Sequence, residues 1–170
     1  MPIPVTVAWL PEGIRILDQS LLPGEERYVT LGSVAEVADA IRTLRVRGAP
    51  LIGVVAAMGV ALAATTSEDS APAVVRRRVD QAGRELVATR PTAVNLRWAV
   101  DRMVAVTNRT MPDARRLVDA LVAEARAIHA EDRAMCEAIG AHPKARFYAA
   151  LAGFTAAFVS VESQGFDLMV

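Results

Sequence analysis

Two arginines stand just before two segments that are predicted to be helices, and this arrangement can bind an anion. The first is Arg47, which Gly48, Ala49 and Pro50 follow at the head of a long apolar run. Proline suits the first turn of a helix, where its missing amide proton is not needed, and glycine lets a ligand approach the backbone. Amides at a helix start carry the positive end of the macrodipole, and arginine can hold two phosphate oxygens at once. This segment is a candidate phosphate site.

The second arginine, Arg90, precedes Pro91 and Thr92 near the predicted start of another helix. Both arginines could hold one phosphate if the fold brings the two helix starts together, which the sequence does not show. The first arginine segment also fits a tight turn between helices with an arginine on the surface. The candidate substrate-binding residues are Arg47, Gly48, Ala49 and Arg90.

A competing candidate lies on the last predicted helix, where the spacing of His129, Asp132 and Cys136 puts them on one face. They could form a thiolate site or part of a metal site. A reactive cysteine needs electropositive surroundings, whereas Glu131 and Glu137 supply the opposite sign. Three ligands on consecutive turns of one helix also span too far for tetrahedral zinc. The alternative is a packed cysteine beside a surface histidine, with Asp132 in a buried hydrogen bond, and we predict neither metal nor other cofactor.

A small sheet and several helices must position these residues. Short stretches in which apolar and polar residues alternate, separated by turn sequences, predict strands at Val5–Trp9, Ile14–Leu17 and Glu26–Thr30. Helical spacing begins at Ser33, which forms a capping-box pattern with Glu36. The apolar residues that mark the helices are Val34, Val37, Ile41 and Leu44; Val75, Val79, Ala82 and Leu86; Leu96, Val100 and Met103; and Leu117, Leu121, Ile128, Met135 and Ile139.

The apolar run Ala49–Ala64 could be a membrane helix or a core helix, and its length decides between the two. It is shorter than the roughly 20 residues needed to cross a bilayer. Because it is apolar around nearly its whole circumference, we expect it to be the most buried helix of a bundle. The predicted fold class is α+β, a small antiparallel N-terminal sheet followed by a helical bundle.

Composition limits the partners and the compartment. The chain has 170 residues, 53% of them hydrophobic, which suits one domain or one domain plus part of another. Nineteen basic residues balance nineteen acidic ones, so neither nucleic acid nor a membrane surface is predicted as a partner. One cysteine and the lack of a signal-peptide pattern at the start favour the cytoplasm.

The character of the chain changes near its end. Pro143 interrupts the last helix, and the segment 143–170 holds all four phenylalanines, Phe147, Phe154, Phe158 and Phe166. We therefore predict a domain over 1–142 and an apolar tail over 143–170, in which Phe147–Val161 is either a buried helix or a segment that packs against a missing part.

Four segments together resemble the N-terminal half of the methylthioribose-1-phosphate isomerase family. They are "LDQSLLPGEERYV", "AIRTLRVRGAPLIGVVAAMGVALA", "RPTAVNLRWAVDRM" and "EDRAMCEAIG". The superfamily also holds ribose-1,5-bisphosphate isomerases and the regulatory subunits of the initiation factor two-B exchange factor. The regulatory subunits keep the fold but match the RGAP-like and RPTAVNL-like segments less closely. The resemblance runs from about Val5 to about Gly140.

The resemblance implies an aldose–ketose isomerisation in methionine salvage, from 5-methylthioribose 1-phosphate to 5-methylthioribulose 1-phosphate. Family residues that hold the phosphate map onto Arg47, Gly48, Ala49 and Arg90. A sugar phosphate is thus the implied ligand, and a homodimer is compatible with the resemblance.

The family's catalytic cysteine and aspartate have no counterpart in these residues. The cysteine belongs to a Thr-His-Cys-Asn-Ala-Gly-like stretch that goes with a Rossmann-like C-terminal domain, which is missing here. Where it should fall, the chain reads Phe154-Thr155-Ala156-Ala157-Phe158, and Cys136 comes too early. We expect the chain alone to be inactive. A fragment of the isomerase, a shifted reading frame and a short non-catalytic sugar-phosphate-binding or protein-interaction module remain open.

Overall fold

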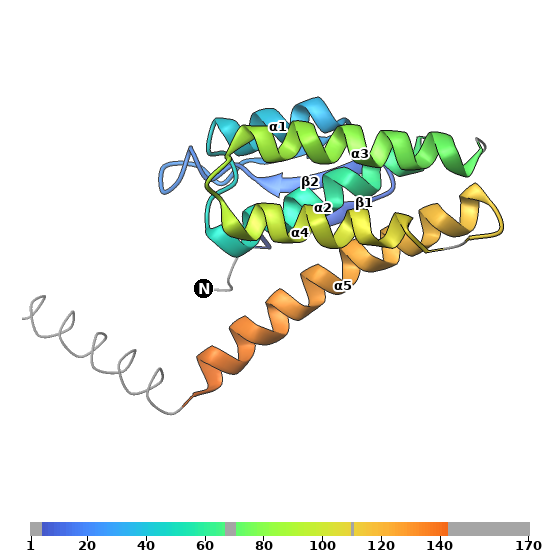
Figure 1. The fold of residues 1–170 in the computed structure, drawn as a ribbon. Helices are drawn as coiled ribbons and strands as arrows, with labels where there is room; N and C mark the ends of the chain where they lie inside the picture. Colours follow the sequence, from blue (N-terminus) through green and yellow to red (C-terminus); the bar gives the residue numbers. More distant parts are fainter. Residues whose placement is uncertain (1–4, 67–70, 110, 143–170) are drawn as a thin grey trace, which may run out of the picture. The chain divides into compact units, whose positions relative to one another are not determined.

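A computed structural model describes residues 5–66, 71–109 and 111–142. In those residues a three-stranded antiparallel sheet is followed by helices α1 to α5, so the predicted α+β class is confirmed (Figure 1). The chain forms two compact units, residues 1–132 and residues 133–170. The sheet, α1 to α4 and most of α5 belong to the first unit.

The sheet contains β1 (Val7–Leu10), β2 (Gly13–Leu17) and β3 (Tyr28–Leu31), paired in that order. Ile14 of β2 lies opposite Trp9 of β1 and Leu31 of β3. Ile14 and Leu31 are buried in the core, which fixes the register because a slip by one residue would turn them to the other face. The hairpin and third strand expected from the sequence are confirmed, with ends that differ by at most two residues.

Helix α1 (Val34–Arg42) begins at the expected cap. The Glu36 amide donates to the Ser33 hydroxyl at 3.3 Å, while the Glu36 carboxylate accepts from the Gly32 amide at 2.6 Å, one residue before the position of an ideal capping box. Leu44 is not part of this helix, contrary to the sequence expectation. It has a φ of +60° and is exposed, because the chain leaves α1 at Thr43 and turns toward α2.

Helix α2 (Ala49–Thr65) is the centre of the first unit, as predicted. Twelve of its 17 residues are buried, and it contacts α1, α3, α4 and β2. Its glycines and alanines allow this close approach on every side, because small side chains bring neighbouring backbones together. No helix among the described residues is long and apolar enough to cross a membrane.

The remaining helices are α3 (Pro72–Thr89), α4 (Val94–Thr107) and α5 (Ala114–Ala141). The apolar stripes expected in α3 and α4 are buried. In α5 the first part of the stripe is buried as far as Ile128. Met135 and Ile139 were expected on the same buried side, but they are 63% and 62% exposed. They lie in the second unit, where Arg133 pairs with Glu137 at 3.5 Å.

Predictions for the phenylalanine-rich tail, including a helix over Phe147–Val161, fall outside the described residues. The predicted boundary between 142 and 143 stays a prediction.

Candidate functional site

The fold brings the starts of α2 and α4 together. Gly53, in the second turn of α2, lies so close to α4 that an added Cβ would be 2.8 Å from the Asn95 carbonyl oxygen and 3.5 Å from the Ala99 Cβ. Figure 1 shows α2 and α4 running in the same direction from one end of the first unit, while α3 returns in the opposite direction. Arg47 and Arg90 belong to the connections at this end.

The backbone before α2 leaves the helix start accessible. Gly48, at the N-cap, has a φ of +94°, which favours glycine, and nothing lies within 4 Å of the position its Cβ would take. No side chain caps the helix, and its first turn contains no acidic residue. Ala49 and Pro50 are exposed. The helix start therefore presents positive dipole ends without an internal carboxylate to neutralise them.

Arg47 is exposed, and two backbone carbonyls hold its guanidinium. Its Nε donates to the Leu44 carbonyl at 3.2 Å, and its Nη2 donates to the Gln19 carbonyl at 2.7 Å. A guanidinium has five N–H donors, so these two hydrogen bonds use only part of its capacity. The remaining donors could bind phosphate oxygens while the side chain stays anchored.

Arg90 caps the C-terminal end of α3, rather than starting α4 directly. Its φ and ψ of −146° and 81° end the helix, and its carbonyl accepts from the Ala93 amide at 3.0 Å, which closes the turn into α4. The side chain is half-exposed. The structure thus brings the backbones of Arg47 and Arg90 to one end of the bundle; that both guanidinium groups reach one phosphate stays a prediction.

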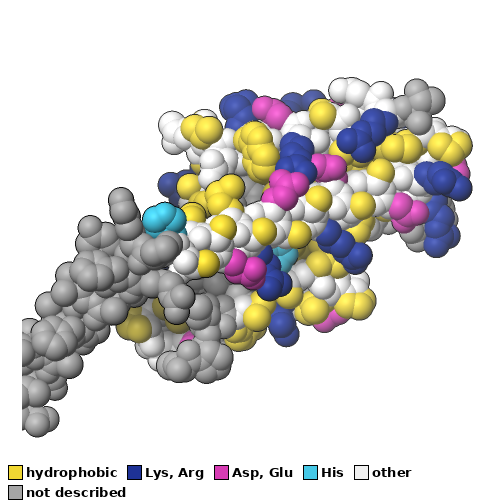
Figure 2. Space-filling model, turned by 90° about the horizontal axis from the view of Figure 1, so that it is seen from below, with side chains coloured by type: hydrophobic (Ala, Val, Ile, Leu, Met, Phe, Trp, Pro, Cys, Tyr) yellow, Lys and Arg dark blue, Asp and Glu magenta, His cyan; other side chains and the backbone are white. Residues whose placement is uncertain are grey.

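A hollow of about 300 Å³ lies beside the start of α4. Its lining residues are Pro91, Thr92, Ala93, Val94, Arg97, Trp98 and Asp101. On the face shown in Figure 2, basic, acidic and apolar side chains are mixed rather than sorted into blocks. The described side chains of that face therefore form no broad basic patch.

The competing cluster on α5 does not form the packed arrangement expected from the sequence. Cys136 is exposed rather than packed in the core. Asp132 and His129 are both half-buried, and the buried hydrogen bond expected for Asp132 stays a prediction. Among residues 5–66, 71–109 and 111–142, no group of three or more His, Cys, Asp or Glu side chains could hold a metal ion.

A charged cluster between α4 and α5 was missed in the sequence. Arg102 donates to Glu124 and to both carboxylate oxygens of Glu131, and its guanidinium carbon lies 5.4 Å from the Trp98 ring centroid. The hydrogen bonds from Arg102 hold the pKa of Glu131 below its ordinary value, despite some opposing desolvation. Glu124 and Glu131 are 22 and 29 positions from Arg102 in the sequence, so helical spacing could not reveal these contacts.

The lowered pKa of Glu131 predicts a pH dependence of stability. The unfolded chain binds a proton at this carboxylate more readily than the folded chain, so the contribution of Glu131 is present at neutral pH. It is lost as the pH falls below about 4 and through the lowered folded-state pKa. Glu131→Gln should therefore flatten the decrease in Tm between neutral and acidic pH, measured by thermal unfolding.

Glu137→Gln is the control, because Glu137 is exposed and its 3.5 Å pair with Arg133 is long. Its Tm profile should follow that of the unchanged chain. Superimposable profiles for Glu131→Gln and the unchanged chain would contradict the prediction.

Comparison with known proteins shows to which family the chain belongs. The model of the initiation factor 2 subunit family matches residues 45–150, which include both arginine segments. The chain belongs to this family.

Several family members similar to the chain are methylthioribose-1-phosphate isomerases. The protein from Gemmatimonas aurantiaca is 46% identical over 146 residues, which are 83% of this chain and 42% of that protein. The protein from Methylorubrum populi is 50% identical over 129 residues, covering 76% of this chain and 33% of that protein. The chain thus spans less than half the length of these relatives.

Two solved structures of the family share the fold. The 5-methylthioribose 1-phosphate isomerase from Pyrococcus horikoshii has a TM-score of 0.69 at 34% identity, covering 76% of this chain and 36% of that one. The translation initiation factor eIF-2B subunit delta from A. fulgidus has the same TM-score at 31% identity, covering 75% and 37%. The fold is therefore common to an enzyme and a translation factor.

Proposed function

We propose that this chain is the phosphate-binding N-terminal part of a methylthioribose-1-phosphate isomerase. The reaction would convert 5-methylthioribose 1-phosphate to 5-methylthioribulose 1-phosphate in methionine salvage. The phosphate on the anomeric carbon prevents the ring from opening as a free sugar does, so a site for this substrate must hold a phosphate next to the reacting carbons. Arg47, Gly48, Ala49 and Arg90 are the residues that we assign to this phosphate.

The observation that carries the proposal is the contact of Gly53 with Asn95. It puts the starts of α2 and α4 side by side, and each start follows a connection that contains one of the two arginines. Two adjacent helix starts and two guanidinium groups are the donors that a phosphate dianion prefers.

Phosphate anchorage alone does not explain isomerisation. It holds the substrate and the transition state nearly alike, so it supports binding more than chemistry. Moving a proton between adjacent carbons needs a positioned acid–base group, which contributes about 10²–10⁴-fold. No residue of the 170 matches the family's catalytic cysteine or aspartate. We therefore expect these residues by themselves to bind the sugar phosphate in the cytoplasm without converting it, as a monomer or a homodimer.

A non-catalytic binding or interaction module is the second candidate, because the eIF-2B subunit matches the fold as well as the isomerase does. Sequence favours the isomerase: the relatives named methylthioribose-1-phosphate isomerase reach 50% identity, against 31% for the translation factor.

Titration of the purified chain with 5-methylthioribose 1-phosphate, followed by a product assay, tests the proposal. We expect saturable binding without turnover, in the unchanged chain and in Cys136→Ala alike. A lack of binding would overturn the assignment of the phosphate site. Robust turnover that disappears in Cys136→Ala would instead identify the exposed Cys136 as a catalytic thiol.

A further inference from the structure

The loop after β2 contains a buried carboxylate that the proposed function does not use. Asp18 is only 7% exposed, although it lies at the end of a strand, directly before a loop. Its Oδ1 accepts hydrogen bonds from the Ser20 amide at 3.0 Å and from the Ser20 hydroxyl. This double contact closes a tight turn around Gln19, of the kind that an aspartate side chain stabilises by bonding to the backbone two residues later.

The turn holds the connection before α2 at two points. The Gln19 amide donates to the Arg45 carbonyl at 3.0 Å, and the Gln19 carbonyl accepts from Arg47 Nη2 at 2.7 Å. One residue of the loop thus bonds both the backbone of the connection and the guanidinium that we assign to the phosphate. Gln19 and Arg47 are 28 positions apart in the sequence.

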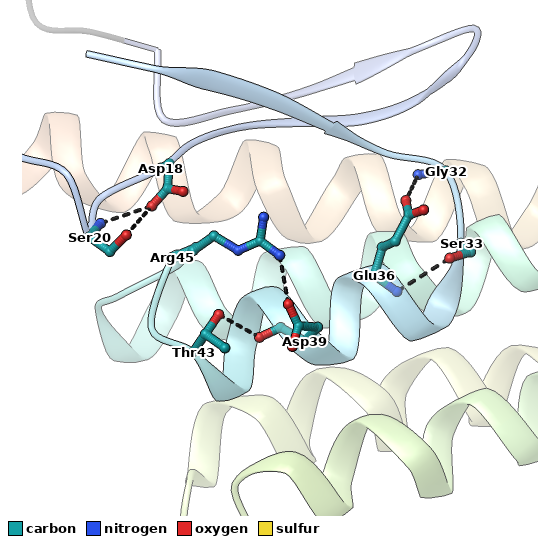
Figure 3. A network of polar contacts seen from close by, with 8 residues as sticks. All are labelled: Asp18, Ser20, Gly32, Ser33, Glu36, Asp39, Thr43 and Arg45. Atoms are coloured by element: carbon teal, nitrogen blue, oxygen red, sulfur yellow. Dashed lines mark hydrogen bonds and ion pairs between the residues drawn. The ribbon is translucent and has the colours of Figure 1, made fainter. Parts of the chain in front are cut away.

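The opposite side of the connection is held by α1. Arg45 Nη2 pairs with Asp39 Oδ2 at 2.7 Å, and the Val46 amide donates to the Ala40 carbonyl at 3.3 Å. Figure 3 shows Arg45 between the Asp18–Ser20 turn and Asp39. The backbone of the connection is therefore bonded to α1 as well as to the loop, whereas the Arg47 guanidinium is held by the Gln19 carbonyl of the loop and by the Leu44 carbonyl of the connection itself.

We propose that Asp18 is a positioning residue for Arg47, a role that rests on the proposed phosphate site. Its carboxylate orients Ser20, the resulting turn directs the Gln19 carbonyl toward Arg47, and that carbonyl holds the guanidinium of a residue in the connection that leads into α2. An arginine side chain ordered in advance loses less conformational entropy when it binds an anion, so the turn increases phosphate affinity without touching the ligand.

Asp18→Ala and Asp18→Asn distinguish positioning from general stability. Asparagine keeps an oxygen acceptor for Ser20, whereas alanine removes it. We expect the alanine variant to bind inorganic phosphate about three- to tenfold more weakly, the range given by one hydrogen bond of ordinary net strength. The asparagine variant should restore binding to nearly the affinity of the unchanged chain.

A second readout follows Arg47 itself and does not depend on phosphate. The ¹⁵N heteronuclear NOE of the Arg47 Nε–H reports motion of the guanidinium on the picosecond-to-nanosecond scale. It should fall in Asp18→Ala and remain high in Asp18→Asn. If Asp18→Ala does not fold, Ser20→Ala takes its place, because Ser20 is exposed and this change removes only the hydroxyl contact to Asp18.

The two readouts separate the two proposals. If the unchanged chain does not bind phosphate, the proposed function fails, and the Arg47 NOE alone then decides whether Asp18 positions this side chain. If phosphate binds and the alanine variant shows the same affinity and the same Arg47 NOE, the positioning role is overturned. Equal losses in the alanine and asparagine variants would also overturn it, because the acceptor oxygen would then not matter.

Discussion

Replacing either Arg47 or Arg90 by alanine should reduce the affinity of the chain for phosphate by about tenfold, and replacing both should reduce it by clearly less than about 100-fold, the product of the two single losses. A hydrogen bond to a charged group is worth about 1.5–3 kcal/mol, or about 10- to 150-fold in a dissociation constant. Calorimetric titration with inorganic phosphate and with 5-methylthioribose 1-phosphate measures the effect. Because Arg47 is exposed and Arg90 is half-exposed, neither change should lower Tm by more than a few degrees.

The control for charge is Arg77→Ala. Arg77 is an exposed arginine in the first half of α3, which begins at the end of the first unit opposite to the starts of α2 and α4. Its removal changes the net charge equally and should leave phosphate affinity within about twofold. The unchanged chain, the two single variants and the double variant of Arg47 and Arg90 form a double-mutant cycle, which gives a second criterion. If the two arginines share one phosphate, their effects should not be additive, and strict additivity would favour two independent surface arginines.

The elements of the fold were predictable where local patterns determine them. The stripe Val75, Val79, Ala82 and Leu86 is buried as its spacing requires, and Ser33 caps α1 as its side chain allows. The burial of α2 also followed from sequence, because a helix without a polar face has no side to present to water. The two arginine segments could likewise be found from residue types alone.

Contacts between distant segments were not predictable in the same way. Nothing near Arg47 in the sequence indicates that Gln19 accepts from its guanidinium, and the positive φ of Leu44 depends on how α1 and α2 are packed. The exposure of Cys136 and Met135 was missed for a related reason. Helical periodicity shows which residues share a face, but a face is buried only if another element covers it.

Gly53→Ala should destabilise the first unit by about 1–3 kcal/mol, because it inserts a methyl group where α2 and α4 are closest. The added Cβ would lie 2.8 Å from the Asn95 carbonyl oxygen, and this neighbour is backbone, which cannot rotate out of the way as a side chain can. The higher helix propensity of alanine offsets at most about 1 kcal/mol. For a chain of this size each kcal/mol lowers Tm by about 2–4 °C, which thermal unfolding followed by circular dichroism can measure.

The same substitution should weaken phosphate binding, because moving Asn95 away from α2 separates the two helix starts. Gly59→Ala is the matched control on the same helix. Its added Cβ would meet side-chain methyl groups of Val37 and Leu86 at 3.0 and 3.2 Å, six residues farther from the start of α2. Whatever it does to Tm, Gly59→Ala should leave phosphate affinity unchanged. If Gly53→Ala lowered Tm but bound phosphate as tightly as Gly59→Ala, the closeness of the helix starts would be a packing requirement and not a binding one.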